Sequence, residues 1–310
     1  MKKSPKGFIP VMLTPFLKDG TVDYDGLTIL TEFYLSSGAS GLFANCQSSE
    51  MFELTDQERL DITRHVVKVA NGAVPVVAAG TFSRDLSQQA NFVKQIYDTG
   101  IEAVIIITGM LAKKDEPDDI LNKNVFELIN QTGAIPLGFY ECPVPYKRVL
   151  TAEQLGEFVD TGRIIYHKDT CLDLNLVKAK LEATKGHSFG LYDAYMGHAV
   201  ESLKAGSAGL SCIQGNYFPE LVTWLCKNYN NSELTWEVDQ VQQFFIDNMQ
   251  IMHEEYPVVG KFFLQRRGLN ISTFSRQGSN LISKKAKADM HKLQHDYNQI
   301  HQLLKFENKI

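Results

Sequence analysis

The chain has 310 residues, of which 44% are hydrophobic and 22% charged, a composition typical of a folded globular protein rather than a disordered or fibrous one. Its formal net charge of -5 gives no basic footprint for nucleic acid, and no apolar run reaches membrane-spanning length. We therefore expect neither nucleic-acid nor membrane partners. A cytoplasmic location is expected because the apolar run at residues 8–13 is too short for a secretory signal.

The five cysteines are widely spaced, odd in number and without a CxxC pair. This spacing argues against disulfides and against structural zinc. We interpret them as small buried thiols. No metal and no cofactor are expected.

Short apolar segments recur along the first two thirds of the chain, each followed by a polar loop and then a helical pattern. Eight of them are predicted to be strands: residues 8–13, 41–45, 74–79, 103–107, 135–140, 164–168, 188–192 and 208–212. Capping boxes at Thr55 with Glu58 and at Thr151 with Gln154 mark two of the intervening helices. Eight strands alternating with helices indicate an α/β fold, a closed parallel (β/α)8 TIM barrel, because right-handed crossovers place every helix outside.

The alternation stops at about Ser232, and the remainder of the chain is predicted to be helical. The clearest helix carries five apolar residues at helical spacing: Met290, Leu293, Tyr297, Ile300 and Leu304. We predict a barrel over residues 1–231 and a C-terminal helical extension over residues 232–310, packed on the barrel. The junction at residues 230–232 is short enough to be an ordinary loop instead.

The sixth predicted strand ends in Lys168 and then breaks into polar residues. Its carboxyl end is where barrel enzymes keep their catalytic residues. Burial there would lower the pKa of the amine, because the loss of water penalises the ammonium form, and the neutral amine could attack a carbonyl carbon. The alternative is a strand-end lysine whose amine extends into solvent.

Other polar side chains at strand carboxyl ends would face the same mouth of the barrel. Ser48 and Ser49 follow the second strand, Tyr140 ends the fifth, and Asp193 follows the seventh. An amine for imine formation, hydroxyl and N–H groups for a carboxylate, and a phenol to move a proton are what cleavage of a 2-oxo acid requires. Taken singly, Tyr140 could be a core aromatic residue and the serines a helix-entry loop.

Several motifs, in order along the chain, resemble the dihydrodipicolinate synthase and N-acetylneuraminate lyase family of pyruvate-handling class I aldolases. They are residues 7–10 with 14–16, residues 19–23, Leu54-Thr55 with Glu58-Arg59, Tyr140 with Pro143, residues 167–170, and residues 206–209 with 216–220. The resemblance implies a (β/α)8 barrel with a C-terminal helical extension, with Lys168 as the Schiff-base lysine and Tyr140 as the proton carrier. It also implies assembly as a homotetramer, and we expect a homotetramer or a homodimer.

The chain departs from the family in the loop after the second strand. Where the family has Gly-Thr-Thr-Gly-Glu, residues 46–50 read Cys-Gln-Ser-Ser-Glu. Gln47, Ser48 and Ser49 are predicted to bind the substrate carboxylate through hydroxyl and backbone N–H groups, although Gln47 and Ser49 are bulkier than their counterparts. The synthases also place a tyrosine after the fourth strand, where residues 108–111 read Thr-Gly-Met-Leu. The proton relay therefore lacks that tyrosine, and true dihydrodipicolinate synthase activity is not expected.

The other end of the substrate is predicted to contact the loops after the fifth and seventh strands. The arginine that binds the aldehyde partner in the synthases would fall near Pro145, close to Lys147 and Arg148. Arg148 is predicted to bind an acidic group and Asp193 to accept hydroxyl hydrogen bonds. Ser211, in the eighth strand, completes the predicted substrate-binding set. The plainer alternative is that the two cations are solvated loop charges.

The sequence thus predicts a lyase or aldolase that forms an imine with a 2-oxo acid, pyruvate plus an aldehyde derived from a sugar. One alternative is a dehydratase that uses the same imine to remove water from a 2-keto-3-deoxy sugar acid. An alternative of another class is a catalytically silent paralogue that only binds a 2-oxo acid.

Overall fold

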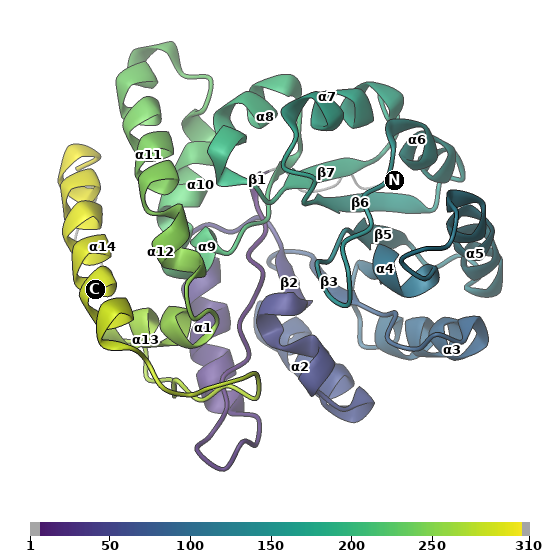
Figure 1. The fold of residues 1–310 in the computed structure, drawn as a ribbon, viewed down its shortest axis with the longest axis horizontal. Helices are drawn as coiled ribbons and strands as arrows, with labels where there is room; N and C mark the ends of the chain where they lie inside the picture. Colours follow the sequence, from purple (N-terminus) through teal and green to yellow (C-terminus); the bar gives the residue numbers. More distant parts are fainter. Residues whose placement is uncertain (1–6, 306–310) are drawn as a thin grey trace.

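The structure is a computed structural model that describes residues 7–305. Its eight parallel strands form one sheet in the order β1-β8-β7-β6-β5-β4-β3-β2 (Figure 1). The strands are β1 (Gly7–Phe8), β2 (Leu42–Asn45), β3 (Val76–Ala79), β4 (Ala103–Ile107), β5 (Leu137–Tyr140), β6 (Ile164–Asp169), β7 (Gly190–Asp193) and β8 (Gly209–Leu210). A parallel bridge from Val11 to Phe43 brings the chain after β1 against β2. The predicted closed barrel is confirmed.

Strands β1 and β8 are shorter than the predicted runs, although the pairing extends past them. Pro10 has no N–H group to add to a ladder. On either side of it, the Ile9 N–H donates to the Leu210 carbonyl and the Phe43 N–H donates to the Pro10 carbonyl, at 2.9 and 3.0 Å. A Cβ atom on Gly209 would lie 1.7 Å from the carbonyl oxygen of Gly7, so only glycine permits this close approach.

Helices surround the barrel and connect its strands. The longer ones are α1 (Tyr24–Ser36), α2 (Asp56–Ala70), α3 (Leu86–Tyr97), α5 (Asp118–Gln131), α6 (Ala152–Asp160), α7 (Leu174–Ala183), α8 (Ala199–Ala205) and α10 (Pro219–Asn228). Short elements lie near strand ends: 3-10 helices η1 (Gln47–Ser49), η2 (Met51–Glu53) and η3 (Met196–His198), and helices α4 (Thr108–Leu111) and α9 (Gln214–Tyr217). Both predicted capping boxes are confirmed, at the starts of α2 and α6.

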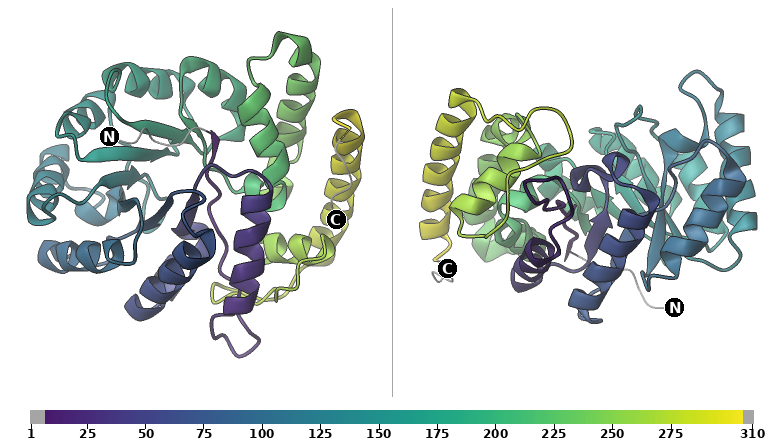
Figure 2. Two further views of the ribbon diagram at one scale, coloured as in Figure 1. Left: turned by 180° about the vertical axis from the view of Figure 1, so that it is seen from behind. Right: turned by 90° about the horizontal axis from the view of Figure 1, so that it is seen from below.

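The C-terminal part of the described chain forms four helices that pack on one side of the barrel (Figures 1 and 2). After the 3-10 helix η4 (Ser232–Leu234) they are α11 (Thr235–Asp247), α12 (Met249–His253), α13 (Val258–Arg266) and α14 (Lys284–Leu303). We call residues 232–305 the extension. Four of the five predicted apolar residues of the last helix are buried, whereas Leu304 caps its end and is only partly buried.

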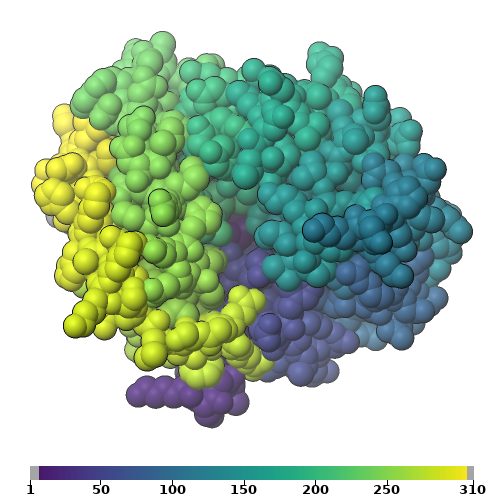
Figure 3. All heavy atoms as spheres, viewed as in Figure 1, coloured from purple at the N-terminus to yellow at the C-terminus, as the bar shows by residue number. Residues whose placement is uncertain are grey.

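The extension shares one hydrophobic core with the outer layer of the barrel. Phe218 of the barrel, Phe244 and Met290 belong to the same cluster of buried residues. Figure 3 shows a hollow between the extension and the barrel, with N-terminal residues visible at its base. The domain division at residue 231 stays a prediction. Within residues 7–305, no helix is both long and apolar enough to cross a membrane.

A second, smaller core fills the barrel interior, and the alternation of the strands decides which side chains enter it. On β5, Phe139 packs in the outer core and Tyr140 in the inner one. On β6, Tyr166 belongs to the inner core. Because successive side chains of a strand point to opposite faces, Lys168 points inward and its neighbours His167 and Asp169 point outward.

Candidate functional site

Lys168 and Tyr140 lie side by side at the carboxyl ends of two neighbouring strands. They are register partners in the pairing of β5 with β6. The Nζ atom of Lys168 lies 4.2 Å from the centroid of the Tyr140 ring and 5.8 Å from that of Phe43. Lys168 is only 4% exposed and Tyr140 only 3% exposed. The structure therefore brings the two predicted catalytic residues together inside the barrel.

The surroundings of Lys168 favour the neutral amine. Burial lowers the pKa of Lys168 below its ordinary value, because the ammonium loses its water. Among the described residues, the groups that oppose this shift are the thiols of Cys46, Cys142 and Cys212, and no carboxylate contributes. Burial raises the pKa of Cys142 to about 11 and that of Cys212 to about 12, so these thiols stay protonated near neutral pH. The amine is thus close to weak dipoles and not to a full negative charge.

The Tyr140 phenol belongs to a short chain of hydrogen bonds. It shares a hydrogen bond with the thiol of Cys142. The Cys142 Sγ atom in turn donates to Oε1 of Gln47, at 3.6 Å. Burial raises the pKa of Tyr140 well above its ordinary value. The phenol therefore keeps its proton near neutral pH, as a proton donor must.

The loop after β2 separates its two predicted serines into different roles. The Ser49 hydroxyl donates to the carbonyl of Met12 at 2.6 Å and accepts from the backbone N–H of Cys46 at 3.1 Å. Those bonds fix the loop and occupy the hydroxyl. Ser48 is also buried, and its hydroxyl shares a hydrogen bond with the phenol of Tyr256. Of the two serines, Ser48 has the hydroxyl directed toward other site residues.

Glu50, at the end of the same loop, fastens it to the extension. Its Oε1 atom accepts from Nζ of Lys261 at 2.7 Å, and both side chains are fully buried. Its Oε2 atom accepts from the Ser275 hydroxyl at 2.8 Å and from the backbone N–H groups of Arg276 and Gln277 at 2.7 and 3.1 Å. The loop that carries Gln47 and Ser48 is therefore held by residues far along the chain.

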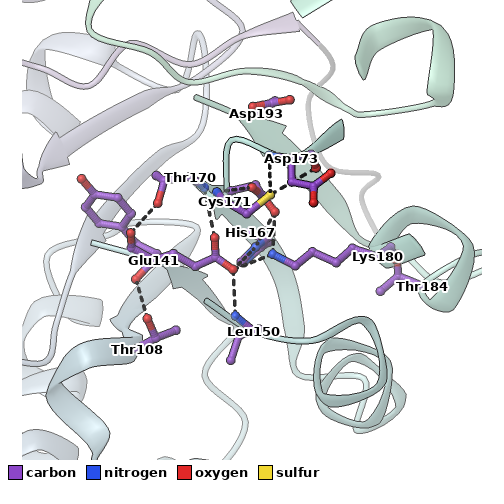
Figure 4. Close-up of polar contacts among 12 residues, drawn as sticks. Thr108, Glu141, Leu150, His167, Thr170, Cys171, Asp173, Lys180, Thr184 and Asp193 are labelled. Atoms are coloured by element: carbon purple, nitrogen blue, oxygen red, sulfur yellow. Dashed lines mark hydrogen bonds and ion pairs between the residues drawn. The ribbon is translucent and has the colours of Figure 1, made fainter. Parts of the chain in front are cut away.

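A buried charge cluster lies on the outer side of β6, where Figure 4 shows Glu141, His167 and Lys180 directed toward one another. Lys180 extends from α7, and its Nζ atom lies 2.6 Å from Oε1 of Glu141 and 2.7 Å from Oδ2 of Asp169. The Nε2 atom of His167 lies 3.4 Å from each of the same two oxygens. All four side chains are fully buried.

The members of this cluster shift each other's pKa. Burial lowers the pKa of Lys180 and of His167, but the two carboxylates outweigh burial and raise both above their ordinary values. Burial raises the pKa of Asp169, but His167 and Lys180 outweigh it and hold that pKa well below the ordinary value. Glu141, His167 and Asp169 have the donor atoms of a metal site. Here the Lys180 ammonium supplies the positive charge that their carboxylates require.

The predicted specificity residues are engaged by the protein itself. Asp193 accepts from the backbone N–H of Tyr195, and its Oδ2 atom lies 2.9 Å from Nε2 of His198. The Ser211 hydroxyl donates to the Ile9 carbonyl at 2.9 Å inside the barrel. The Arg148 guanidinium donates to two carbonyls in the segment before α5 and to Asp118, the first residue of α5, at 2.7 to 2.8 Å. Their roles in substrate binding stay predictions.

Sequence reasoning missed two residues of the site. Cys142 lies two positions after Tyr140, and the period of a strand could have placed it on the same side. Tyr256 lies between α12 and α13, and its phenol accepts a hydrogen bond from Nδ2 of Asn216 at 2.6 Å. No strand-end pattern marks Tyr256, because the fold of the extension brings it to the barrel.

The protein is thus a (β/α)8 barrel with a desolvated lysine at the end of β6 and a tyrosine beside it. Residues 4–296 match the model of the dihydrodipicolinate synthetase family, and the chain belongs to that family. The resemblance seen in the motifs is confirmed.

Curated relatives and solved structures agree with this assignment. The chain is 26% identical over 265 residues to the 4-hydroxy-tetrahydrodipicolinate synthase of Shewanella baltica, covering 85% of this chain and 88% of the relative. It is 28% identical over 216 residues to the same enzyme of Jannaschia sp., covering 70% of this chain and 72% of the relative. The fold matches YagE of Escherichia coli, solved with pyruvate, at a TM-score of 0.83, 21% identity and coverage of 94% and 98%. It also matches the dihydrodipicolinate synthase of Acinetobacter baumannii, likewise solved with pyruvate, at a TM-score of 0.84 and 21% identity. That match covers 95% of this chain and 99% of the synthase.

Proposed function

We propose that the protein is a lyase that forms an imine between Lys168 and a 2-oxo acid, and then makes or breaks the bond next to the resulting enamine. The observation that carries this proposal is the position of Lys168, buried at the end of β6 with its Nζ atom 4.2 Å from the ring centroid of Tyr140. Its lowered pKa shifts the equilibrium toward the neutral amine, which is the form that attacks a carbonyl carbon.

In the first step, the amine nitrogen attacks the carbonyl carbon. The carbonyl oxygen takes up two protons, one from that nitrogen and one from the Tyr140 phenol, and leaves as water. The product is an imine between Nζ and the former carbonyl carbon. Tyr140 keeps its proton because its pKa is raised, so it can donate that proton to the departing oxygen. In the cleavage direction, the protonated imine accepts the electron pair of the broken carbon–carbon bond. The hydroxyl group on the departing carbon gives its proton to the Tyr140 phenolate and becomes the carbonyl of the aldehyde. After the aldehyde leaves, Tyr140 returns the proton to the enamine carbon, and water then releases pyruvate from Lys168.

Pyruvate is the proposed common fragment because two proteins of the same fold, YagE and the Acinetobacter baumannii synthase, were solved with it. We infer an aldehyde partner different from that of the synthases, because Met110 and Leu111 occupy α4 after the fourth strand and both are buried. A sugar-derived aldehyde fits the proposal. Elimination of water from a 2-keto-3-deoxy sugar acid would use the same imine and yield a dehydrated keto acid in place of an aldehyde. Assembly as a homotetramer or homodimer is part of the proposal.

Borohydride reduction in the presence of pyruvate tests the mechanism. We expect a reduced adduct on Lys168 in mass spectrometry, and none in Lys168→Met. Tyr140→Phe should still form the adduct but should turn over a 2-keto-3-deoxy sugar acid about 100- to 10,000-fold more slowly, which is the usual contribution of a positioned proton donor. Analysis of the products separates cleavage from dehydration.

An adduct on another lysine, or no adduct, would contradict the imine mechanism. Stabilisation by pyruvate that survives Lys168→Met unchanged, without turnover of any 2-keto-3-deoxy compound, would favour the catalytically silent alternative. The silent alternative leaves the conjunction of Lys168 with Tyr140 unexplained, since binding a carboxylate requires neither an imine nor a mobile proton.

A further inference from the structure

We propose that Tyr256 of the extension is a further substrate-binding residue, whose phenol donates, together with the Ser48 hydroxyl, to the carboxylate of the bound 2-oxo acid. The inference rests on the proposed function and adds to it. It assigns part of the substrate site to a segment that follows the last barrel strand by many residues.

The direction of the hydrogen bonds at Asn216 leaves the phenol proton of Tyr256 available. The Oδ1 atom of Asn216 accepts from the phenol of Tyr34 at 2.5 Å. Its Nδ2 atom donates to the carbonyl of Val11 at 2.8 Å and to the phenol oxygen of Tyr256 at 2.6 Å. An amide has one acceptor oxygen and two N–H donors, so this set fixes its orientation. The Tyr256 oxygen accepts from Asn216, and its own proton is free to be donated.

The neighbour that shares this proton is a serine at the barrel mouth. The Ser48 hydroxyl and the Tyr256 phenol form a hydrogen bond. Burial raises the pKa of Tyr256 above its ordinary value, so the phenol stays neutral and keeps its proton. Two adjacent hydroxyl groups, both with protons, form a donor pair. A carboxylate, which only accepts hydrogen bonds, is the complementary ligand.

The donor pair lies near the proposed reacting centre. Asn216, which donates to the Tyr256 phenol at 2.6 Å, also donates to the carbonyl of Val11 at 2.8 Å, and Val11 belongs to the same inner cluster as Tyr140. Tyr140 is the residue whose ring lies 4.2 Å from Nζ of Lys168. In a 2-oxo acid the carboxylate is bonded directly to the carbonyl carbon, so the groups that hold it must lie close to the attacking amine. Tyr256 meets this requirement.

The extension holds Tyr256 in place independently of any ligand. Its ring packs against that of Tyr217, with centroids 6.4 Å apart. A few residues further on, Lys261 is buried in its ion pair with Glu50, which closes the loop that carries Ser48. The same anchor therefore fixes the positions of both hydroxyl groups.

The test compares Tyr256→Phe with Tyr217→Phe. Each change removes one phenol oxygen from the same group of rings, but the Tyr217 phenol donates to the Met252 carbonyl at 2.9 Å, away from Ser48. Borohydride trapping on Lys168 is measured against the concentration of pyruvate and, in parallel, of acetone, a ketone without a carboxylate. For Tyr256→Phe we expect the half-saturating concentration of pyruvate to rise about tenfold or more, as for a lost hydrogen bond to a charged group. The half-saturating concentration of acetone and the maximal amount of adduct should not change.

Ser48→Ala provides a second variant and should show the same selective loss for pyruvate. Tyr217→Phe should bind both ketones as the wild-type protein does. Equal losses for pyruvate and acetone, or equal losses in the Tyr256 and Tyr217 variants, would show that Tyr256 acts only through packing and would overturn the inference. A normal pyruvate response in Tyr256→Phe would overturn it while leaving the imine mechanism intact. Absence of an adduct in the wild-type protein would overturn both.

Discussion

Two buried lysines, Lys168 and Lys180, lie on opposite sides of strand β6 and have opposite electrostatic surroundings. Lys168 points into the barrel, where burial lowers its pKa and thiols are the neighbours that oppose the shift. Lys180 reaches the outer side from α7, where Glu141 and Asp169 outweigh burial and raise its pKa. The difference shows that burial alone does not decide the charge of a lysine. The nearest carboxylates do.

Lys261 in the extension is an intermediate case. It pairs with a single carboxylate, that of Glu50, at 2.7 Å. Burial lowers its pKa, Glu50 opposes the shift, and the nearby Arg276 adds to it, so the net pKa is below the ordinary value. One carboxylate is thus insufficient where two reverse the effect of burial on Lys180.

The largest expected effect is the difference in stability between variants that lack one or the other amine. Lys180→Met removes the ammonium from two buried carboxylates and leaves them with His167 alone. It should lower the free energy of unfolding by about 3 to 5 kcal/mol, as is usual when one partner of a buried ion pair is lost. Lys168→Met removes a buried amine that has no carboxylate partner among the described residues, and it should cost much less. Chemical unfolding at neutral pH measures both. A loss in Lys168→Met as large as that in Lys180→Met would contradict the comparison.

A smaller effect is expected in the pH dependence of stability, with opposite signs for the two lysines. The folded pKa of Lys168 lies below 10.5, so between that pKa and 10.5 the unfolded state binds more protons and stability rises with pH. The folded pKa of Lys180 lies above 10.5, so its contribution is complete below 10.5 and is lost as pH rises through the folded pKa.

The comparison of the wild-type protein with Lys168→Met isolates the contribution of Lys168 to the pH dependence of stability. As pH rises from neutral toward 10.5, the wild-type protein should gain stability relative to the variant, by at most about 1.4 kcal/mol per pH unit. The rate of borohydride trapping should rise over the same range, because both report deprotonation of one amine. A stability difference that is flat or falls with pH would mean that the Lys168 pKa is not lowered.

The smallest expected effect is at Arg148, outside both of these environments. If its guanidinium also contacts an acidic substrate, Arg148→Ala should weaken the binding of acidic 2-keto-3-deoxy compounds by about 1 kcal/mol more than that of neutral ones. The value is modest because protein oxygens share the guanidinium. Asp118→Ala is the matched control, since it removes the ion pair at 2.7 Å and keeps the arginine. If both variants act equally on acidic and neutral compounds, Arg148 has only a structural role.

The barrel and its two central residues could be predicted from sequence because the signals are local. A buried parallel strand is a continuous apolar run, and a lysine that ends it must lie at the carboxyl face. The capping boxes at Thr55 and Thr151 are equally local and were predicted correctly. Family motifs then added the pairing of Lys168 with Tyr140, which the register of β5 with β6 now shows.

The partners of those residues could not be predicted in the same way, because they depend on packing between distant segments. Lys180 reaches Glu141 and Asp169 across the space between helix α7 and the outer side of the sheet, at 2.6 and 2.7 Å. Arg148 was predicted to bind an acidic group of the substrate, but the fold also provides it with protein acceptors, the carbonyls of Lys113 and Glu116 and the Asp118 carboxylate at the start of α5. Tyr256 reaches Asn216 and Ser48 through the fold of the extension.

The bonds of Glu50 have a consequence for the order in which the protein matures during synthesis. The last barrel strand ends at Leu210, yet Glu50 needs Lys261, Ser275, Arg276 and Gln277 to satisfy its buried carboxylate. A ribosome releases these residues well after every strand has emerged. The loop that carries Ser48 therefore reaches its final shape only when nearly the whole chain has been translated, and a nascent barrel, however complete its strands, has an unfinished mouth.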